Sequence, residues 1–226
     1  FTINDLFFFD YNCQFDFNPC QCFQIRWCPP TPPYPPYPPY PPTPPTPPTP
    51  PIPPVNNNTT IIPFASGPAF SMLVTTEGQP GPATFIGFGT SETQANPLVN
   101  PIDLTGVFSS YAFQMPRNGV LRRLTVTYTT VGENVIPTGS VNIYAQLYVA
   151  NQNSNLYYPI NQSLIQLTPS LTGVVADGTI LTGTANINVN VSENQKLLLV
   201  IYAIPTGTGG GEITVTGVVN AGLTIN

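Results

Sequence analysis

The chain contains no histidine, and all four of its cysteines lie in the first 28 residues. Residues 29–226 therefore offer neither a histidine base nor a cysteine nucleophile for Ser-His-Asp or Cys-His catalysis. The acidic residues of this region each stand in or beside an expected turn, and no two have the spacing of a calcium loop: Glu77, Glu92, Asp103, Glu133, Asp177, Glu193 and Glu212. We expect no enzyme activity, no cofactor and no metal site.

Charge is scarce as well. Only 7% of the 226 residues are charged, against about 25% in ordinary globular chains. With five Lys and Arg residues and a net charge of −5, the chain has no basic patch for a nucleic acid. No apolar run approaches the roughly 18–20 residues that span a bilayer. The composition suits a static surface protein, without nucleic acid or a membrane span.

Glycine is missing from residues 29–55, where Pro-Pro-Xaa triplets repeat without a change of register. Consecutive prolines exclude a helix or central strand and favour polyproline II, whose rise of about 3.1 Å extends 27 residues to roughly 80 Å. The third residues fall on one line along this stalk. If these side chains face outward, they form a solvated row. If they face inward, which is the interpretation we favour, they form an apolar seam between the stalks of three chains. The seam residues are Tyr34, Tyr37, Tyr40, Ile52 and Val55.

Threonines on the same line are sterically open and are candidate O-glycosylation sites. They are Thr43, Thr46 and Thr49.

The four cysteines have the spacing C-x6-C-x-C-x5-C, without the C-x2-C pairs of common zinc sites. They are Cys13, Cys20, Cys22 and Cys28. Two interpretations remain open: ordinary intrachain disulfides, or interchain disulfides that tie several chains together. We favour interchain disulfides, because a segment of 28 residues cannot build its own core. Either implies an oxidising, extracellular location.

Residues 1–28, the arm, are rich in aromatic side chains that cannot remain solvated alone. The arm either folds back as a strand on residues 61–226 of its own chain, which we call the head, or buries itself in another molecule. A rigid stalk disfavours the first alternative. We therefore expect the arm to dock on other copies by strand addition to a sheet edge. The docking residues are Phe1, Ile3, Leu6, Phe7, Phe8 and Phe9.

Residues 61–226, the head, show period-two alternation typical of β-strands, as at 124–129, 141–149 and 213–225. Residues 197–201 are continuously apolar, which predicts a strand buried on both faces. Further strands are expected at 70–76, 83–88, 107–115, 163–167 and 179–191, with turns between them that include 137–139. About ten short strands without helical periodicity predict an all-β, two-sheet jelly roll.

Arg122 and Arg123 are adjacent within one of these strands. Successive strand residues point to opposite faces, so we expect one arginine on each face. One of them is a candidate partner for a buried or interfacial carboxylate such as Asp103.

Seven segments of the head resemble, in order, the C-terminal domain of BclB-type exosporium glycoproteins. The segments are residues 62–67, 85–89, 102–106, 112–119, 145–148, 197–200 and 221–225. The resemblance implies a homotrimeric, TNF/C1q-like jelly roll on the exosporium of a bacterial spore, with a spore-surface anchor protein as a further partner. Members usually carry a collagen-like stalk, which this glycine-free stalk cannot be. The arm, stalk and head together also resemble subunits of thin endospore appendages.

The chain thus divides into the arm (1–28), the stalk (29–55), a polar joint (56–60) and the head (61–226). The leading hypothesis is a structural, homotrimeric subunit of a spore-surface fibre, which polymerises when its arm docks on the head of the neighbouring trimer. The alternative is a terminal trimer, anchored by the arm, whose head is a ligand-binding or adhesion module.

Overall fold

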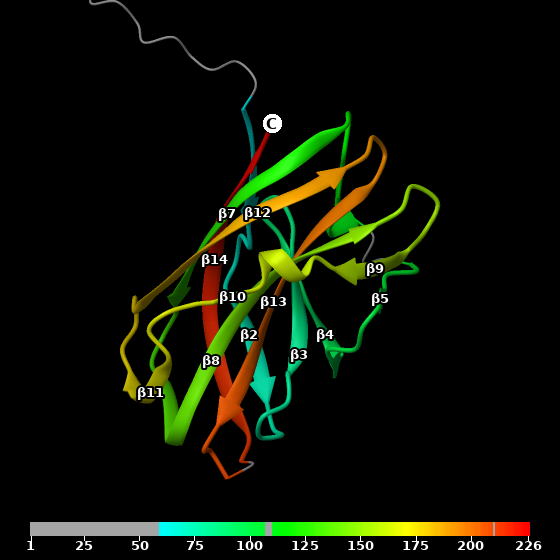
Figure 1. Cartoon of the computed structure of the whole chain (residues 1–226). Coiled ribbons are helices and arrows are strands. Elements are labelled where there is room, and N and C mark those ends of the chain that lie inside the picture. The colour runs from blue at the N-terminus through cyan, green and yellow to red at the C-terminus, as the bar shows by residue number, and fades with distance from the viewer. Residues whose placement is uncertain (1–58, 107–109, 210) are drawn as a thin grey trace, which may run out of the picture. The chain divides into compact units, whose positions relative to one another are not determined.

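A computed structural model describes residues 59–106, 110–209 and 211–226. All of them belong to the second of two compact units, Ile52–Asn226. The described part is all-β, as predicted, and one of its few helical turns is the 3₁₀ turn η2 (Figure 1). The elements are β1 (Thr60–Ala65), β2 (Phe70–Val74), β3 (Pro82–Ile86), β4 (Ser91–Pro97), β5 (Ile102–Asp103), β6 (Phe113–Gln114), β7 (Gly119–Thr130), β8 (Asn134–Ala150), β9 (Leu156–Pro159), η2 (Asn161–Ser163), β10 (Ile165–Gln166), β11 (Leu171–Val175), β12 (Ile180–Val191), β13 (Lys196–Thr206) and β14 (Ile213–Ile225).

The strands form two antiparallel sheets. Sheet A has the order β1-β14-β7-β12, and β2 pairs with the other half of β14. Sheet B has the order β4-β3-β13-β8-β9-β5, with β6 beside β13 and with β10 and β11 beside β8. Neighbouring strands of a sheet are often far apart in sequence, as β1 and β14 are. The fold therefore depends on long-range pairing.

The core lies between the two sheets. The alternation at 124–129 is confirmed, because Leu124, Val126 and Tyr128 are buried there. The strand expected to be buried on both faces is β13: Leu197, Leu199 and Ile201 join this core, whereas Leu198 and Val200 join a second one. Burying one such aliphatic side chain contributes about 1.5–3 kcal/mol. The apolar run of β13 thus holds two layers together.

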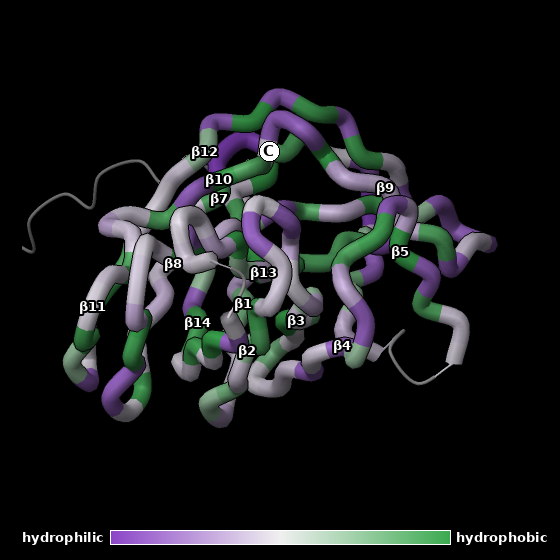
Figure 2. The backbone as a smooth tube through the Cα atoms, turned by 90° about the horizontal axis from the view of Figure 1, so that it is seen from below, coloured by the Kyte–Doolittle hydropathy of each residue, from purple (hydrophilic) through white to green (hydrophobic). Residues whose placement is uncertain are grey.

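The second core covers part of the outer face of sheet B. The chain between β4 and β6 crosses this face and buries Ile102 and Leu104 against Tyr148 of β8 and Tyr157 of β9. Figure 2 shows the green, hydrophobic stretch at β5 that belongs to this cover. Sheet B is therefore enclosed on both faces over part of its length.

Strand β8 is longer than predicted. The expected turn at 137–139 lies inside it, and the pairing with β11 shifts register between Leu171 and Gly173. Gly139 has a φ of 70°, and a Cβ there would lie 2.3 Å from the carbonyl oxygen of Thr206. Glycine thus bends the strand without ending it. The turn prediction at this position was wrong.

Other boundaries differ too. The strand expected at 107–115 is reduced to β6 within the described residues, and that expected at 163–167 is η2 followed by β10. Strands β1, β4, β5, β9 and β11 were not predicted, because they are short or, in the case of β4, polar. β4, with the sequence SETQANP, lies at the edge of sheet B and is mostly exposed. An edge strand needs no alternating apolar face, so the sequence gives no signal for it.

Candidate functional site

The residues predicted to carry assembly lie outside the described residues. They are the cysteines Cys13, Cys20, Cys22 and Cys28, the docking residues Phe1, Ile3, Leu6, Phe7, Phe8 and Phe9, the seam residues Tyr34, Tyr37, Tyr40, Ile52 and Val55, and the glycosylation candidates Thr43, Thr46 and Thr49. These predictions stay predictions. What the structure supplies is the surface of the head on which a partner would act.

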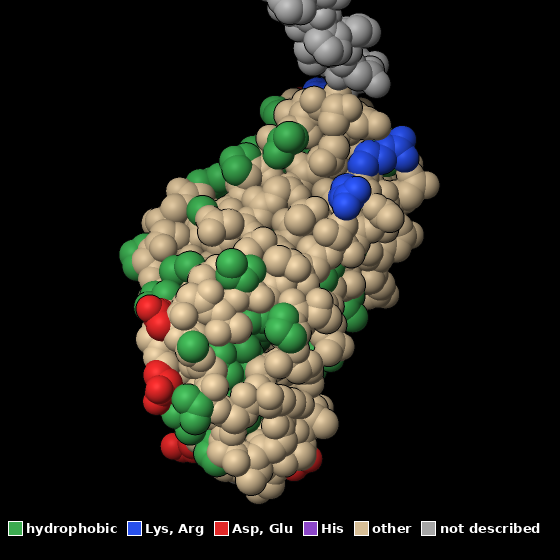
Figure 3. All heavy atoms as spheres, turned by 90° about the vertical axis from the view of Figure 1, so that its left-hand side faces the viewer, with side chains coloured by type: hydrophobic (Ala, Val, Ile, Leu, Met, Phe, Trp, Pro, Cys, Tyr) green, Lys and Arg blue, Asp and Glu red, His purple; other side chains and the backbone are tan. Residues whose placement is uncertain are grey.

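Charge on the head is divided between its two ends. The four cations, Arg117, Arg122, Arg123 and Lys196, lie where β7 and β13 begin and β14 ends; we call this the basic end. Glu193 is the acidic residue in the β12–β13 turn of the same end. Figure 3 shows Lys and Arg side chains toward one end of the face it presents and Asp and Glu toward the other.

The opposite end, the acidic end, consists of the turns β2–β3, β7–β8, β11–β12 and β13–β14. Each turn contributes one acidic residue, namely Glu77, Glu133, Asp177 and Glu212, and among the described residues no Lys or Arg lies in these turns. The prediction that the acidic residues stand in or beside turns is right for these four and for Glu193. Glu92 and Asp103 lie in the edge strands β4 and β5, beside the connections at 87–90 and 104–106, which also agrees with the prediction.

Carboxylates at the acidic end hold neighbouring turns together. Glu77 accepts hydrogen bonds from the backbone N–H groups of Gly207 at 2.7 Å and Gly209 at 3.1 Å. Asp177 accepts one from the N–H of Gly132 at 2.8 Å. Hydrogen bonds to a charged acceptor are stronger than neutral ones. These two charges therefore have a structural use within the head.

The arginines of the basic end form no hydrogen bond with a charged partner among the described residues. Opposite β14, β7 has a bulge in which Arg122 is the extra residue, whereas opposite β12 the extra residue belongs to β12, where Ile187 and Asn188 face the single residue Arg122. The bulge exposes both Arg122 and Arg123, so the prediction of one on each face was wrong. Arg122 Nη1 donates to Asn188 Oδ1 at 2.7 Å, and Arg117 Nη2 donates to Thr60 Oγ1 at 3.3 Å. No arginine of the described residues forms an ion pair.

The proposed pairing of an arginine with Asp103 is also wrong. Asp103 is exposed, and its carboxylate accepts hydrogen bonds from the Thr105 hydroxyl at 2.7 Å and the Thr105 N–H at 2.9 Å. These bonds, the hydroxyl first, hold the pKa of Asp103 below its ordinary value. A local turn therefore satisfies this carboxylate. Sequence spacing did not reveal it, because Asp-x-Thr is common in loops.

The outer face of sheet A carries rows of hydroxyl side chains. Thr125 pairs across strands with Thr184, at 3.3 Å between the hydroxyls, and Ser71 pairs with Thr216 at 2.8 Å. At the basic end of this face one row runs Ile61, Thr224, Arg123 and Asn186. Ile61 is 67% exposed. An exposed apolar side chain thus lies two strands away from an exposed arginine.

At the second core, the outer face of sheet B also holds a polar aromatic cluster. Tyr144 and Tyr202 are stacked with ring centroids 5.5 Å apart, and the Tyr144 hydroxyl donates to Gln166. Gln166 donates in turn to Asn142. Burial, and next the proximity of Tyr144, raise the pKa of Tyr202 to about 12. The side chains of Tyr144, Gln166 and Asn142 thus satisfy one another through these hydrogen bonds.

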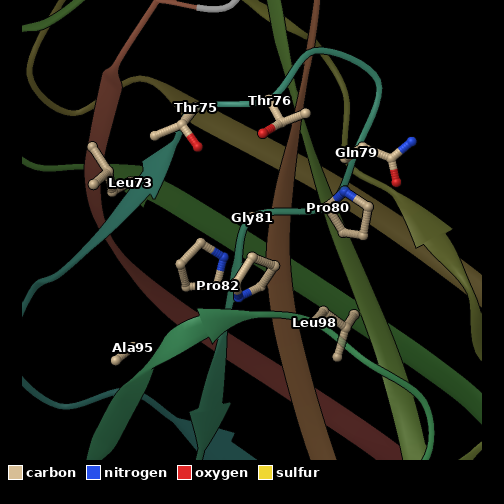
Figure 4. A pocket seen from close by; sticks show the side chains of 10 residues that line it. Leu73, Thr75, Thr76, Gln79, Pro80, Gly81, Pro82, Ala95 and Leu98 are labelled. Atoms are coloured by element: carbon tan, nitrogen blue, oxygen red, sulfur yellow. The ribbon is translucent and has the colours of Figure 1, made fainter.

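A shallow groove of about 340 Å³ lies between the edges of the two sheets (Figure 4). Its lining is uncharged and comes from the end of β2, the β2–β3 loop and β4. It comprises Leu73, Thr75, Thr76, Gln79, Pro80, Gly81, Pro82, Ala95, Pro97 and Leu98. Threonine hydroxyls and the Gln79 amide are its main polar side-chain groups. The groove can contact an uncharged ligand but offers no acid, base or nucleophile.

The head shows no further reactive arrangement in its described parts. No three side chains of His, Cys, Asp or Glu type are grouped there as metal ligands would be. Over the same residues, no helix is long and apolar enough to cross a bilayer. The features that sequence reasoning missed are the division of charge between the ends, the bulge at Arg122 and the Tyr144–Tyr202 pair. Each depends on strand pairing between distant segments.

Comparison with known proteins adds little. No protein-family model matches the chain, and no curated protein matches its sequence. A structure of infectious bursal disease virus, Gx strain, is 9% identical, with a TM-score of 0.35, and the match covers 75% of this chain and 32% of that one. This chain thus spans about a third of the viral chain. A bacterial lipoprotein from Bacteroides thetaiotaomicron is 11% identical, with a TM-score of 0.31. This match covers 76% of this chain and 90% of the lipoprotein chain. Neither likeness carries an argument.

Proposed function

We propose that the protein is a structural subunit of a bacterial spore-surface fibre, homotrimeric through its head and polymerising through its arm. The observation that carries the proposal is the order of segments in one chain: a Cys- and Phe-rich arm, nine Pro-Pro-Xaa triplets and a cysteine-free β head. In this proposal the Pro-Pro-Xaa segment is a polyproline II stalk, whose rise would extend it to roughly 80 Å. The arm then buries its aromatic residues in another copy, and a contact that does not close makes a filament.

We further propose that the two antiparallel sheets form a jelly roll of the TNF/C1q kind and that three heads associate. The enclosed core between the sheets and the resemblance to exosporium glycoproteins support this assignment. The head contains no cysteine, so the trimer depends on packing. Light scattering of the chain after reduction of its disulfides should give the mass of a trimer at micromolar concentration. A stable monomer would contradict the trimer.

Disulfides in this proposal link arms within one bundle. The head contains no cysteine, so no disulfide can join an arm to a neighbouring head. Electrophoresis without reductant should show a cross-linked oligomer that becomes a monomer on reduction. A monomer band without reductant would remove the interchain disulfides but not the fibre.

The experiment for the fibre is negative-stain microscopy of the purified full chain. The proposal expects filaments whose repeat is about one stalk plus one head.

The second candidate function is a terminal trimer whose head binds a ligand, and the uncharged groove in Figure 4 is the observation that favours it. Isolated knobbed rods would favour that candidate and contradict the fibre.

A further inference from the structure

The basic end of the head carries positive charge that the head itself does not use. Arg117, Arg122 and Arg123 donate only to neutral oxygens or have no described acceptor, and none is paired with a carboxylate within the described residues. Two of the three are exposed side by side by the bulge in β7. Away from a nucleic acid or an acidic membrane, the chemistry that matches such a patch is an acidic peptide.

The arm has the complementary charge. Residues 1–28 contain Asp5, Asp10 and Asp16 against the single cation Arg26, and residues 29–58 contain no charge. Each aspartate directly precedes an apolar or aromatic residue: Leu6, Tyr11 and Phe17. Each carboxylate of the arm is therefore adjacent in sequence to an apolar or aromatic side chain. Among the segments of this chain that lie outside the structure, the arm alone is acidic.

We propose that the arm of one copy docks at the basic end of another copy's head, with its aspartates against Arg117, Arg122 and Arg123. This docking rests on the fibre proposed above and assigns the surface on which the arm binds. The row that contains Arg123 also contains Ile61, which is 67% exposed and offers an apolar contact two strands away from the charge.

Reach does not decide between the two ends, because 28 extended residues span up to roughly 90 Å. The sign of the charge does. The acidic end, with Glu77, Glu133, Asp177 and Glu212, repels an acidic arm, whereas the basic end attracts it and raises the rate of encounter. A trimer presents three arms and three heads, so modest pairwise attractions combine.

Backbone pairing alone would not select this site. Ala65 donates its N–H to Gly87, on the side of β1 that faces away from β14. Pro63 stands two residues earlier on the same side and has no N–H to offer. The free edge of β1 is therefore an incomplete template for an added strand. Side-chain charge must supply the selectivity that the edge lacks.

The test is assembly of the full chain, measured as the concentration above which filaments sediment. The variant Arg122→Glu with Arg123→Glu should raise that concentration at least about tenfold, since it replaces attraction with repulsion in every arm contact. Adding Asp10→Arg and Asp16→Arg to the same chain should restore assembly. Added salt should weaken wild-type assembly.

Two variants separate the site from net charge. Each of two double variants lowers the net charge by two. The first carries Arg122→Gln and Arg123→Gln at the basic end, and the second carries Thr76→Glu and Ala176→Glu at the acidic end. The first pair should weaken assembly and the second should not. Circular dichroism and trimer mass show that each variant folds.

Wild-type filaments together with unimpaired assembly of the Arg122→Glu, Arg123→Glu chain would overturn this docking and leave the fibre standing. Equal weakening by the two matched pairs, or failure of the charge exchange to restore assembly, would also overturn it. A wild-type chain that never forms filaments would overturn the fibre and the docking together.

Discussion

The two ends of the head use charge in different ways. At the acidic end, Glu77 and Asp177 accept hydrogen bonds from backbone N–H groups of neighbouring turns. At the basic end, Arg122 donates to the Asn188 amide oxygen, and Arg117 donates to the Thr60 hydroxyl and the Asn118 carbonyl oxygen, all of them neutral acceptors. The comparison suggests that the carboxylates stabilise the fold, whereas the arginines are available to a partner. Charge counts alone would not distinguish these two uses.

The largest effect on stability should come from the framework that supports the acidic end. Gly217 of β14 has no room for a side chain, since a Cβ there would lie 2.4 Å from Cζ of the buried Tyr128. Gly217→Ala should lower the free energy of unfolding by about 3 kcal/mol, the upper part of the range for overpacking. Urea denaturation measures it.

Tyr128→Phe is the control for this site. The Tyr128 hydroxyl is buried and has no hydrogen-bond partner among the described residues. Its removal should leave stability unchanged or raise it, because an unsatisfied buried hydroxyl is costly. If Gly217→Ala proves harmless, the strands at this end adjust more readily than the packing indicates.

A smaller loss is expected at the turns of the acidic end. Glu77→Ala removes the acceptor of two backbone N–H groups, and the loss should be about 1–2 kcal/mol after allowance for exposure. Glu212→Ala, in the neighbouring β13–β14 turn, is the matched control, for which we expect less than about 0.5 kcal/mol. Equal effects of the two substitutions would remove the structural use of Glu77.

At the basic end the same measurement should show almost nothing. Arg122→Gln with Arg123→Gln should change the free energy of unfolding by less than about 0.5 kcal/mol, because exposed polar contacts of arginine contribute little. The combination of unchanged stability and weakened assembly is what distinguishes this end. A loss above about 1 kcal/mol would make the arginines structural as well.

The smallest effect concerns Asp103, which lies in neither end. Its pKa is lowered by the hydrogen bonds from Thr105. A lowered folded pKa means that the contribution of this carboxylate is present above its unfolded pKa and is lost as the pH falls through the folded one. The difference in melting temperature between wild type and Asp103→Ala should therefore be positive at neutral pH and vanish in acid. A constant difference would show that the carboxylate's charge is not involved.

Sequence pattern predicted the inner strands and missed what depends on pairing. The apolar run at 197–201 and the alternation at 124–129 were read correctly, because burial imposes those patterns locally. The polar edge strand β4 and the bulge at Arg122 have no local signal, since both follow from the partner strands. Likewise, Glu77 and Glu212 meet at one end only because the turns of both sheets converge there. The predicted site in residues 1–58 lies outside the described residues.

The most direct test of the account is deletion of residues 1–10 from the full chain, followed by negative-stain microscopy and light scattering. The deletion removes Asp5, Asp10 and the rings of Phe7, Phe8 and Phe9, each of which contributes about 2–3 kcal/mol when buried. The account predicts trimers of normal mass that form no filaments. Filaments of wild-type length from the shortened chain would contradict it.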